Sequence, residues 1–128
     1  MLFERRQFVM AIGAAALGVP AVSSGQSKMY GLIGKMRTQP GQRDALITIL
    51  LAGTGSMPGC LSYVVAKDPA DADGIWITEV WDSQESHKAS LALPSVKEAI
   101  GKGRPLIAGF DQQIPTEPVG GIGLRQSG

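Results

Sequence analysis

The stretch from Gly74 to Pro94, GIWITEVWDSQESHKASLALP, most constrains the fold because a strand pattern runs directly into a helix pattern. Its first half alternates with a period of two, which is typical of a β-strand. Ile75, Glu79 and Trp81 lie on the same side of that strand, because alternate residues share one face. A carboxylate and an indole therefore look into the same space.

A helix is predicted directly after this strand. Asp82 and Ser83 can cap its N-terminus, and Glu85 is placed to close a capping box and to complement the partial positive charge there. The helix carries His87, the single histidine of the chain. We therefore expect any chemistry to lie near this stretch.

The rest of the sequence alternates strand and helix patterns, separated by turns rich in glycine and proline. The predicted segments are a strand over 29–37, a helix over 43–52, a strand over 60–67, the strand ending at Trp81, the helix carrying His87, its continuation after Pro94 through residues 96–106, and a strand over 109–119. This order predicts an α+β domain with the ferredoxin-like βαββαβ arrangement.

Helices cover only one face of such a sheet, so the other face needs polar side chains or a partner. Ile33, Val65, Trp76 and Ile114 supply more large apolar residues than one helical layer requires. We therefore expect a homodimer. The glycine-rich residues 117–124 are either an arm laid over a neighbour or a frayed terminus.

Residues 1–23 have the layout of a secretory signal peptide. Two arginines, Arg5 and Arg6, precede an uncharged apolar run that is shorter than the roughly 20 residues of a membrane span. The order ERRQFV resembles a twin-arginine signal, which directs folded proteins across a bacterial membrane. We expect export to a periplasm, cleavage near Ser23, a short linker over 24–28 and no membrane anchor afterwards. An uncleaved anchor or a misplaced start is the alternative.

The charge balance argues against a nucleic-acid partner. The chain has 12 basic and 11 acidic residues, and losing Glu4, Arg5 and Arg6 with the signal leaves the mature domain neutral. Nucleic-acid binding depends on a basic excess that neutralises phosphates. Cys60 is the only cysteine, so no internal disulfide can form. One histidine and one cysteine also make a zinc site of the usual ligand set unexpected.

Asp71, Asp73 and Gly74 look like part of a calcium-binding loop. However, Pro69 stands where the first ligand would be, and Val80 stands where the closing glutamate should be. We therefore expect no calcium site in this turn.

Three segments then stand out together: MPGCLSYVVAKDP at 57–69, ITEVWDS at 77–83, and SLALP followed by RPLIAGF at 104–110. In this order and spacing they resemble the antibiotic biosynthesis monooxygenase domain, in its quinol monooxygenase group. The resemblance covers about residues 29–119 and leaves 120–128 as a flexible C-terminal tail. It implies a dimeric α+β barrel, with a pocket between each sheet and its helices.

The resemblance also implies a cofactor-independent monooxygenase that oxidises phenols or quinols, with molecular oxygen as co-substrate. Such chemistry needs the phenolate, which a dry pocket with a base and a hydrogen-bond donor would favour. His87 could take the phenol proton. Trp81 could form the pocket wall and donate through its indole nitrogen, and Glu79 could orient His87 or another donor. A solvated histidine and a core tryptophan are the ordinary alternatives.

Three further residues are candidates for substrate binding. Tyr63 is either a pocket wall or a cross-strand sheet contact. Arg104 either binds a substrate anion or pairs with Glu98 or Asp111, and we favour the pairing. Ser90 stands where many family members carry the helix histidine, and the histidine of this chain lies one helical turn earlier.

Two other functions remain open from the sequence. Haem-degrading relatives of this fold use a helix histidine as iron ligand, so His87 also allows haem binding. The asparagine that some relatives use is missing, because the chain contains none. The third function is a dimeric protein that binds a small molecule without catalysis.

Overall fold

The computed structural model describes residues 28–125, and the predicted signal segment lies outside them. The elements of this part are β1 (Tyr30–Thr38), α3 (Arg43–Gly53), β2 (Cys60–Lys67), β3 (Gly74–Trp81), α4 (Gln84–Ser90), α5 (Pro94–Gly103), the short 3₁₀ helix η1 (Arg104–Leu106) and β4 (Ile107–Thr116). Their order is the one that the sequence predicted.

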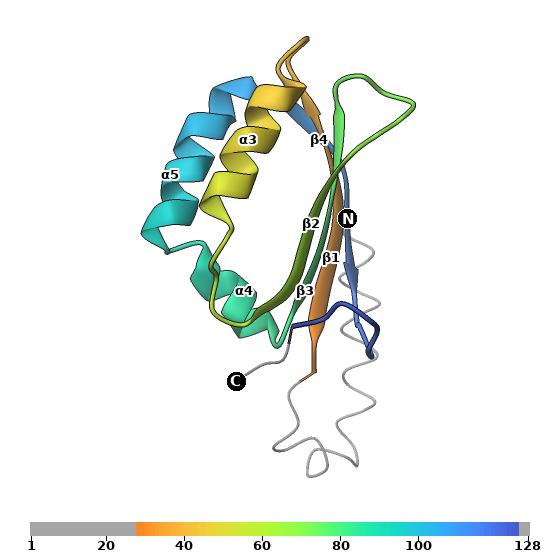
Figure 1. Ribbon diagram of the computed structural model, residues 1–128, viewed down its shortest axis with the longest axis vertical. Coiled ribbons are helices and arrows are strands. Elements are labelled where there is room, and N and C mark those ends of the chain that lie inside the picture. The colour runs from red at the N-terminus through yellow and green to blue at the C-terminus, as the bar shows by residue number, and fades with distance from the viewer. Residues whose placement is uncertain (1–27, 126–128) are drawn as a thin grey trace, which may run out of the picture.

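The four strands form one antiparallel sheet in the order β2-β3-β1-β4. Helices α3, α4 and α5 all lie on one face of it (Figure 1). This is the ferredoxin-like arrangement, with α5 and η1 extending the second helical segment beyond α4. The predicted fold class is confirmed.

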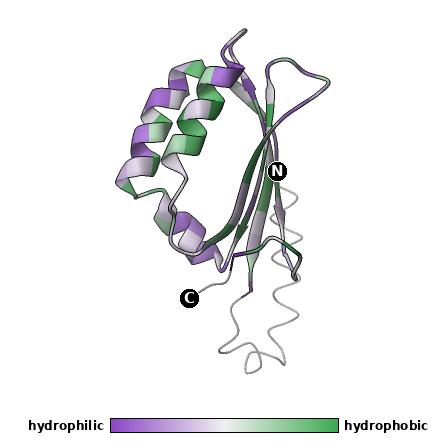
Figure 2. Ribbon diagram, in the orientation of Figure 1, coloured by the Kyte–Doolittle hydropathy of each residue, from purple (hydrophilic) through white to green (hydrophobic). Residues whose placement is uncertain are grey.

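The core lies between the sheet and the helices, and the apolar sides of the helices face the sheet (Figure 2). The alternation in β3 places its apolar residues as predicted, because Ile75, Ile77 and Trp81 are all buried. Two groups of buried side chains fill this layer: Leu46, Ile75 and Ile77 in one, and Met57, Trp81 and Val96 in the other.

The opposite face of the sheet carries apolar side chains, among them Ile33 and Ile114. Ile114 pairs with Ile33 across β1 and β4, and its side chain is 45% exposed. Val65 does not add to this face, because it pairs with the buried Ile77 and packs against the core. Its neighbour Val64 takes the outer position and is 52% exposed.

The first turn of α4 is capped by serines. Ser83 is the N-cap, and its hydroxyl accepts a hydrogen bond from the Ser86 amide at 3.1 Å. A capping box uses the third residue after the cap, and that residue is Ser86, whose hydroxyl lies 3.2 Å from that of Ser83. The predicted roles of Asp82 as a cap and Glu85 as the box residue are therefore wrong. Glu85 still adds a negative charge to the first turn.

Two positively charged side chains, Arg43 and Lys35, hold the turn between β2 and β3. Arg43, at the start of α3, donates from Nη1 to the carbonyl oxygens of Asp68 at 3.2 Å, Asp71 at 2.8 Å and Gly74 at 3.4 Å. The ammonium group of Lys35 lies 3.1 Å from a carboxylate oxygen of Asp68 and 3.1 Å from one of Asp71. The oxygen atoms of this turn are thus engaged by side chains of the chain itself.

Residues 117–125 continue from β4 across one end of the sheet (Figure 1). The Arg125 amide donates to the Leu61 carbonyl at 2.8 Å, on the strand at the other edge of the sheet. This part of the tail therefore contacts its own chain. None of the helices in residues 28–125 has the length and apolar character needed to cross a membrane.

Candidate functional site

A cavity of about 740 Å³ lies between the sheet and the helices, with walls that are mainly apolar. The structure brings all six residues singled out from the sequence to this one cavity. Its wall includes Tyr63, Glu79 and Trp81 from the sheet, His87 and Ser90 from α4, and Arg104 from η1.

Glu79 is the centre of a polar cluster at one end of the cavity. Its Oε1 atom accepts a hydrogen bond from the indole Nε1 of Trp81 at 2.8 Å. The same oxygen lies 3.9 Å from Nε2 of His87, which is too far for a hydrogen bond but close enough for an ion pair when the imidazole carries a proton. The side chains of Glu79 and His87 are only 17% and 22% exposed. A carboxylate and an imidazole thus share a largely enclosed site.

The imidazole of His87 is held between two aromatic rings. The Trp81 ring meets it edge-on, with 5.4 Å between ring centroids, and the Tyr30 ring lies at 5.3 Å. Tyr30 was missed from the sequence. The signal that could have found it is strand pairing, because Tyr30 is the β1 partner of Trp81 and shares its face.

Burial raises the pKa of Glu79 above its ordinary value, while the Trp81 hydrogen bond and the nearby His87 lower it by smaller amounts. The pKa values of the Tyr30 and Tyr63 phenols are also raised, mainly by burial and then by the negative charge of Glu79. The cluster therefore contains a carboxyl group that takes up a proton more readily than a surface glutamate does.

We expect Trp81→Phe to raise the pKa of Glu79 further. The substitution keeps an aromatic ring in the core but removes the N–H donor that stabilises the charged carboxylate. The measurement is an NMR titration of the Glu79 side-chain carboxyl carbon in both proteins. The exposed Glu85 is an internal control, since its titration should not change.

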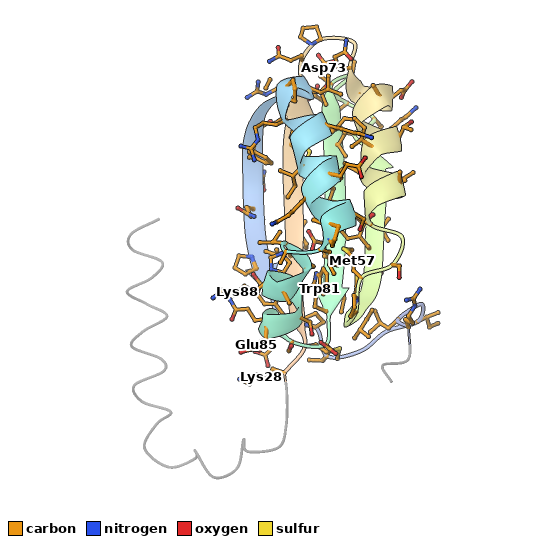
Figure 3. The ribbon with its side chains drawn as sticks, turned by 90° about the vertical axis from the view of Figure 1, so that its left-hand side faces the viewer. Lys28, Met57, Asp73, Trp81, Glu85 and Lys88 are labelled. Carbon is orange, nitrogen blue, oxygen red and sulfur yellow. The ribbon has the colours of Figure 1, made fainter. Side chains whose placement is uncertain are left out.

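Trp81 itself is part of the core as well as of the cavity wall. Its side chain is 1% exposed and packs with Met57 and Val96. Figure 3 shows Trp81 and Met57 close together between the sheet and the helices. Because the indole N–H donates to Glu79, Trp81 acts on that carboxylate and does not present a free donor to the cavity. Glu79 therefore accepts a hydrogen bond from Trp81 and not from His87.

Tyr63 and Ser90 contribute in different ways. Tyr63 lines the cavity and also pairs with Glu79 across β2 and β3, so the wall and sheet alternatives both hold. Ser90 is 4% exposed, and its hydroxyl donates to the His87 carbonyl at 2.6 Å. The Ser90 hydroxyl hydrogen is therefore already used in a hydrogen bond to the helix backbone.

The favoured pairing of Arg104 is wrong. Glu98 pairs with Lys102 at 2.9 Å, one helical turn along α5, and Asp111 pairs with Arg37 at 3.2 Å. Helix geometry explains the first pair, since residues four apart are neighbours on a helix. Arg37 reaches Asp111 because β1 and β4 are adjacent strands. Arg104 contributes a cationic side chain to the cavity wall without either predicted partner.

The cavity wall also includes large apolar side chains that are well exposed. Phe110 of β4 is 68% exposed, Leu91 after α4 is 48% exposed, and Ile100 of α5 is 39% exposed. They were not predicted from the sequence, because no local pattern shows which apolar side chains of β4 and the helices stay exposed. An apolar molecule in the cavity would cover part of this surface.

Comparison with known proteins identifies close relatives of this domain. Residues 29–102 match the sequence model of the family described as antibiotic biosynthesis monooxygenase. A crystal structure of a protein from Chloroflexus aurantiacus, assigned to the antibiotic biosynthesis monooxygenases, is 73% identical. The match covers 75% of this chain and 98% of that protein, with a TM-score of 0.74. No curated protein sequence matches the chain significantly.

More distant structures share the fold. A protein from Caulobacter crescentus, assigned to the same group, is 19% identical with a TM-score of 0.67, and the match covers 73% of this chain and 92% of that one. A similarly assigned protein from Nitrosomonas europaea is 13% identical with a TM-score of 0.62, over 76% of this chain and 93% of the other.

Proposed function

Because the chain belongs to the antibiotic biosynthesis monooxygenase family, we propose that it oxidises a quinol or another phenolic small molecule with O₂, without a cofactor. The observation that carries this proposal is the Glu79–His87 pair at one end of an apolar cavity. Enclosed sites of this kind strengthen the interactions of developing charge with nearby groups.

The first step is removal of the phenol proton. His87 accepts it as the general base, and the resulting imidazolium forms an ion pair with the Glu79 carboxylate 3.9 Å away. Glu79 is kept in place by the Trp81 hydrogen bond. The apolar walls leave the phenolate poorly solvated, which favours loss of an electron from the ring.

The oxidation itself balances with one molecule of O₂. The phenolate passes one electron to O₂, and the resulting ring radical and superoxide join in a C–O bond. The peroxide takes a proton, and its O–O bond breaks as the ring carbon that carries it loses its hydrogen as a proton. One oxygen stays on the ring as a carbonyl, and the other leaves as hydroxide, which takes up that proton and becomes water. For a quinol the sum is quinol plus O₂ giving hydroxyquinone plus water. The protein supplies only a proton acceptor and an enclosed site.

We extend the proposal to assembly and location. The outer sheet face, with Val64 and Ile114 exposed, would be covered in a homodimer. The twin-arginine pattern around Arg5 and Arg6 would direct the protein to the periplasm, where its substrate would be met. Replacing this arginine pair with two lysines should block export if that part of the proposal is right.

The test is oxygen uptake by metal-stripped protein without its first 23 residues, over a panel of benzoquinols and naphthoquinols. We expect uptake above the autoxidation blank for at least one quinol, with one O₂ consumed per hydroxyquinone formed. Heat-denatured protein is the control. A haem titration runs alongside, because His87 is also the residue type that would ligate haem iron. Uptake no faster than the blank would overturn the proposal. A Soret band would then favour haem binding, and saturable quinol binding alone would favour a binding protein.

A further inference from the structure

Gly34 is the one inward-facing position of β1 that has no side chain. It lies on β1 between the inward-facing Leu32 and Met36, and alternation places it on their face. Its partners on either side, Ile77 of β3 and Gln113 of β4, both line the cavity.

The space in front of Gly34 is open. A Cβ atom built there would meet only the Gln112 carbonyl oxygen, at 3.5 Å, which is an ordinary contact. Packing against the helices therefore does not require glycine at this position. Glycine inside a strand destabilises a protein relative to alanine, and it often marks a place where a ligand approaches the backbone.

Gly34 lies between the polar end and the apolar end of the cavity. Glu79 lies one inward-facing row away on one side, and the Met36–Phe110 pair lies one row away on the other. Two residues along a strand span ~7 Å, which is about the length of one aromatic ring with its substituent. A phenol whose hydroxyl lies at the Glu79–His87 pair would therefore lay its next ring over Gly34.

We propose that Gly34 sets how far a planar substrate can extend along the sheet, and that the site accepts phenols with a second ring or a flat extension. The absent side chain joins the polar end of the cavity, at Glu79, to the apolar end, at Met36 and Phe110. A larger residue at this position would separate the two ends. This inference rests on the proposed function only for the placement of the hydroxyl group.

The test is direct binding, so that it does not depend on turnover. Phenol and 2-naphthol are titrated by calorimetry into the wild-type protein, into Gly34→Val and into Gly101→Val. The last variant adds the same side chain at Gly101 of α5, an exposed glycine where an added Cβ would meet nothing within 4 Å. We expect Gly34→Val to weaken 2-naphthol binding at least tenfold and phenol binding less than twofold, while Gly101→Val changes neither.

Equal losses for phenol and 2-naphthol in Gly34→Val would overturn the inference, because they would indicate general damage to the site. So would unchanged 2-naphthol binding, or no 2-naphthol binding by the wild-type protein. Thermal unfolding of each variant shows whether it is folded. If the size discrimination is found but no quinol is oxidised, the proposed function fails and the role of Gly34 remains.

Discussion

Replacing His87 with alanine is expected to lower kcat for quinol oxidation by about 10²–10⁴-fold, the usual contribution of a general base. The imidazole lies beside Glu79 and is packed between Tyr30 and Trp81, so its loss removes the proposed proton acceptor from the cluster. Initial rates of oxygen uptake at saturating quinol measure this effect.

Added imidazole separates a chemical role of His87 from a structural one. The cavity left by His87→Ala can admit free imidazole, and we expect the rate to recover in proportion to its concentration. Lys88→Ala is the matched control, because Lys88 is the next residue of α4 and its side chain is exposed (Figure 3). A His87→Ala protein that stays inactive in imidazole while remaining folded would contradict the assignment of His87 as the base.

Glu79→Gln is expected to lower kcat by about 10–100-fold, because the imidazolium formed in the reaction loses its counter-charge. Glutamine keeps the size of the side chain and can still accept the Trp81 hydrogen bond. In the wild-type protein the rate should fall as the pH drops through the raised pKa of Glu79. In Glu79→Gln this part of the acid limb should be lost.

The same substitution should stabilise the protein at neutral pH. Burial raises the pKa of Glu79 in the folded state, so the folded protein holds this proton more tightly than the unfolded chain does. The favourable contribution is complete below the unfolded pKa and is lost as the pH rises through the folded pKa. Glu79→Gln should therefore unfold at a higher temperature than the wild type at pH 7, and the difference should disappear near about pH 4. A lower unfolding temperature at pH 7 would contradict this account.

Much of the site could be predicted because it depends on local periodicity. The alternation in β3 put Glu79 and Trp81 on the inner face, and the helix directly after β3 brought His87 back over that strand. These relations need only the geometry of one strand and one helix.

The rest of the site depends on contacts that no local pattern contains. Tyr30 reaches His87 only because β1 pairs with β3 in a particular register. Asp111 pairs with Arg37 instead of Arg104 because β1 and β4 are adjacent and their register shifts beside Asp111. Gly34 could not be identified from the sequence, because its proposed role depends on the space left by its missing side chain.

The turn between β2 and β3 has a consequence for local unfolding. Loops usually open far more easily than the strands they connect, and they exchange their amide hydrogens first. In this turn, Arg43 fastens three carbonyl groups to the start of α3, and Lys35 fastens two carboxylates to β1. The Asp68, Asp71 and Gly74 amides are also hydrogen-bonded within the turn. Opening this turn would break its contacts with a helix and a central strand together. Its amide hydrogens should therefore exchange as slowly as those of the sheet, and the turn should resist proteases to the same degree.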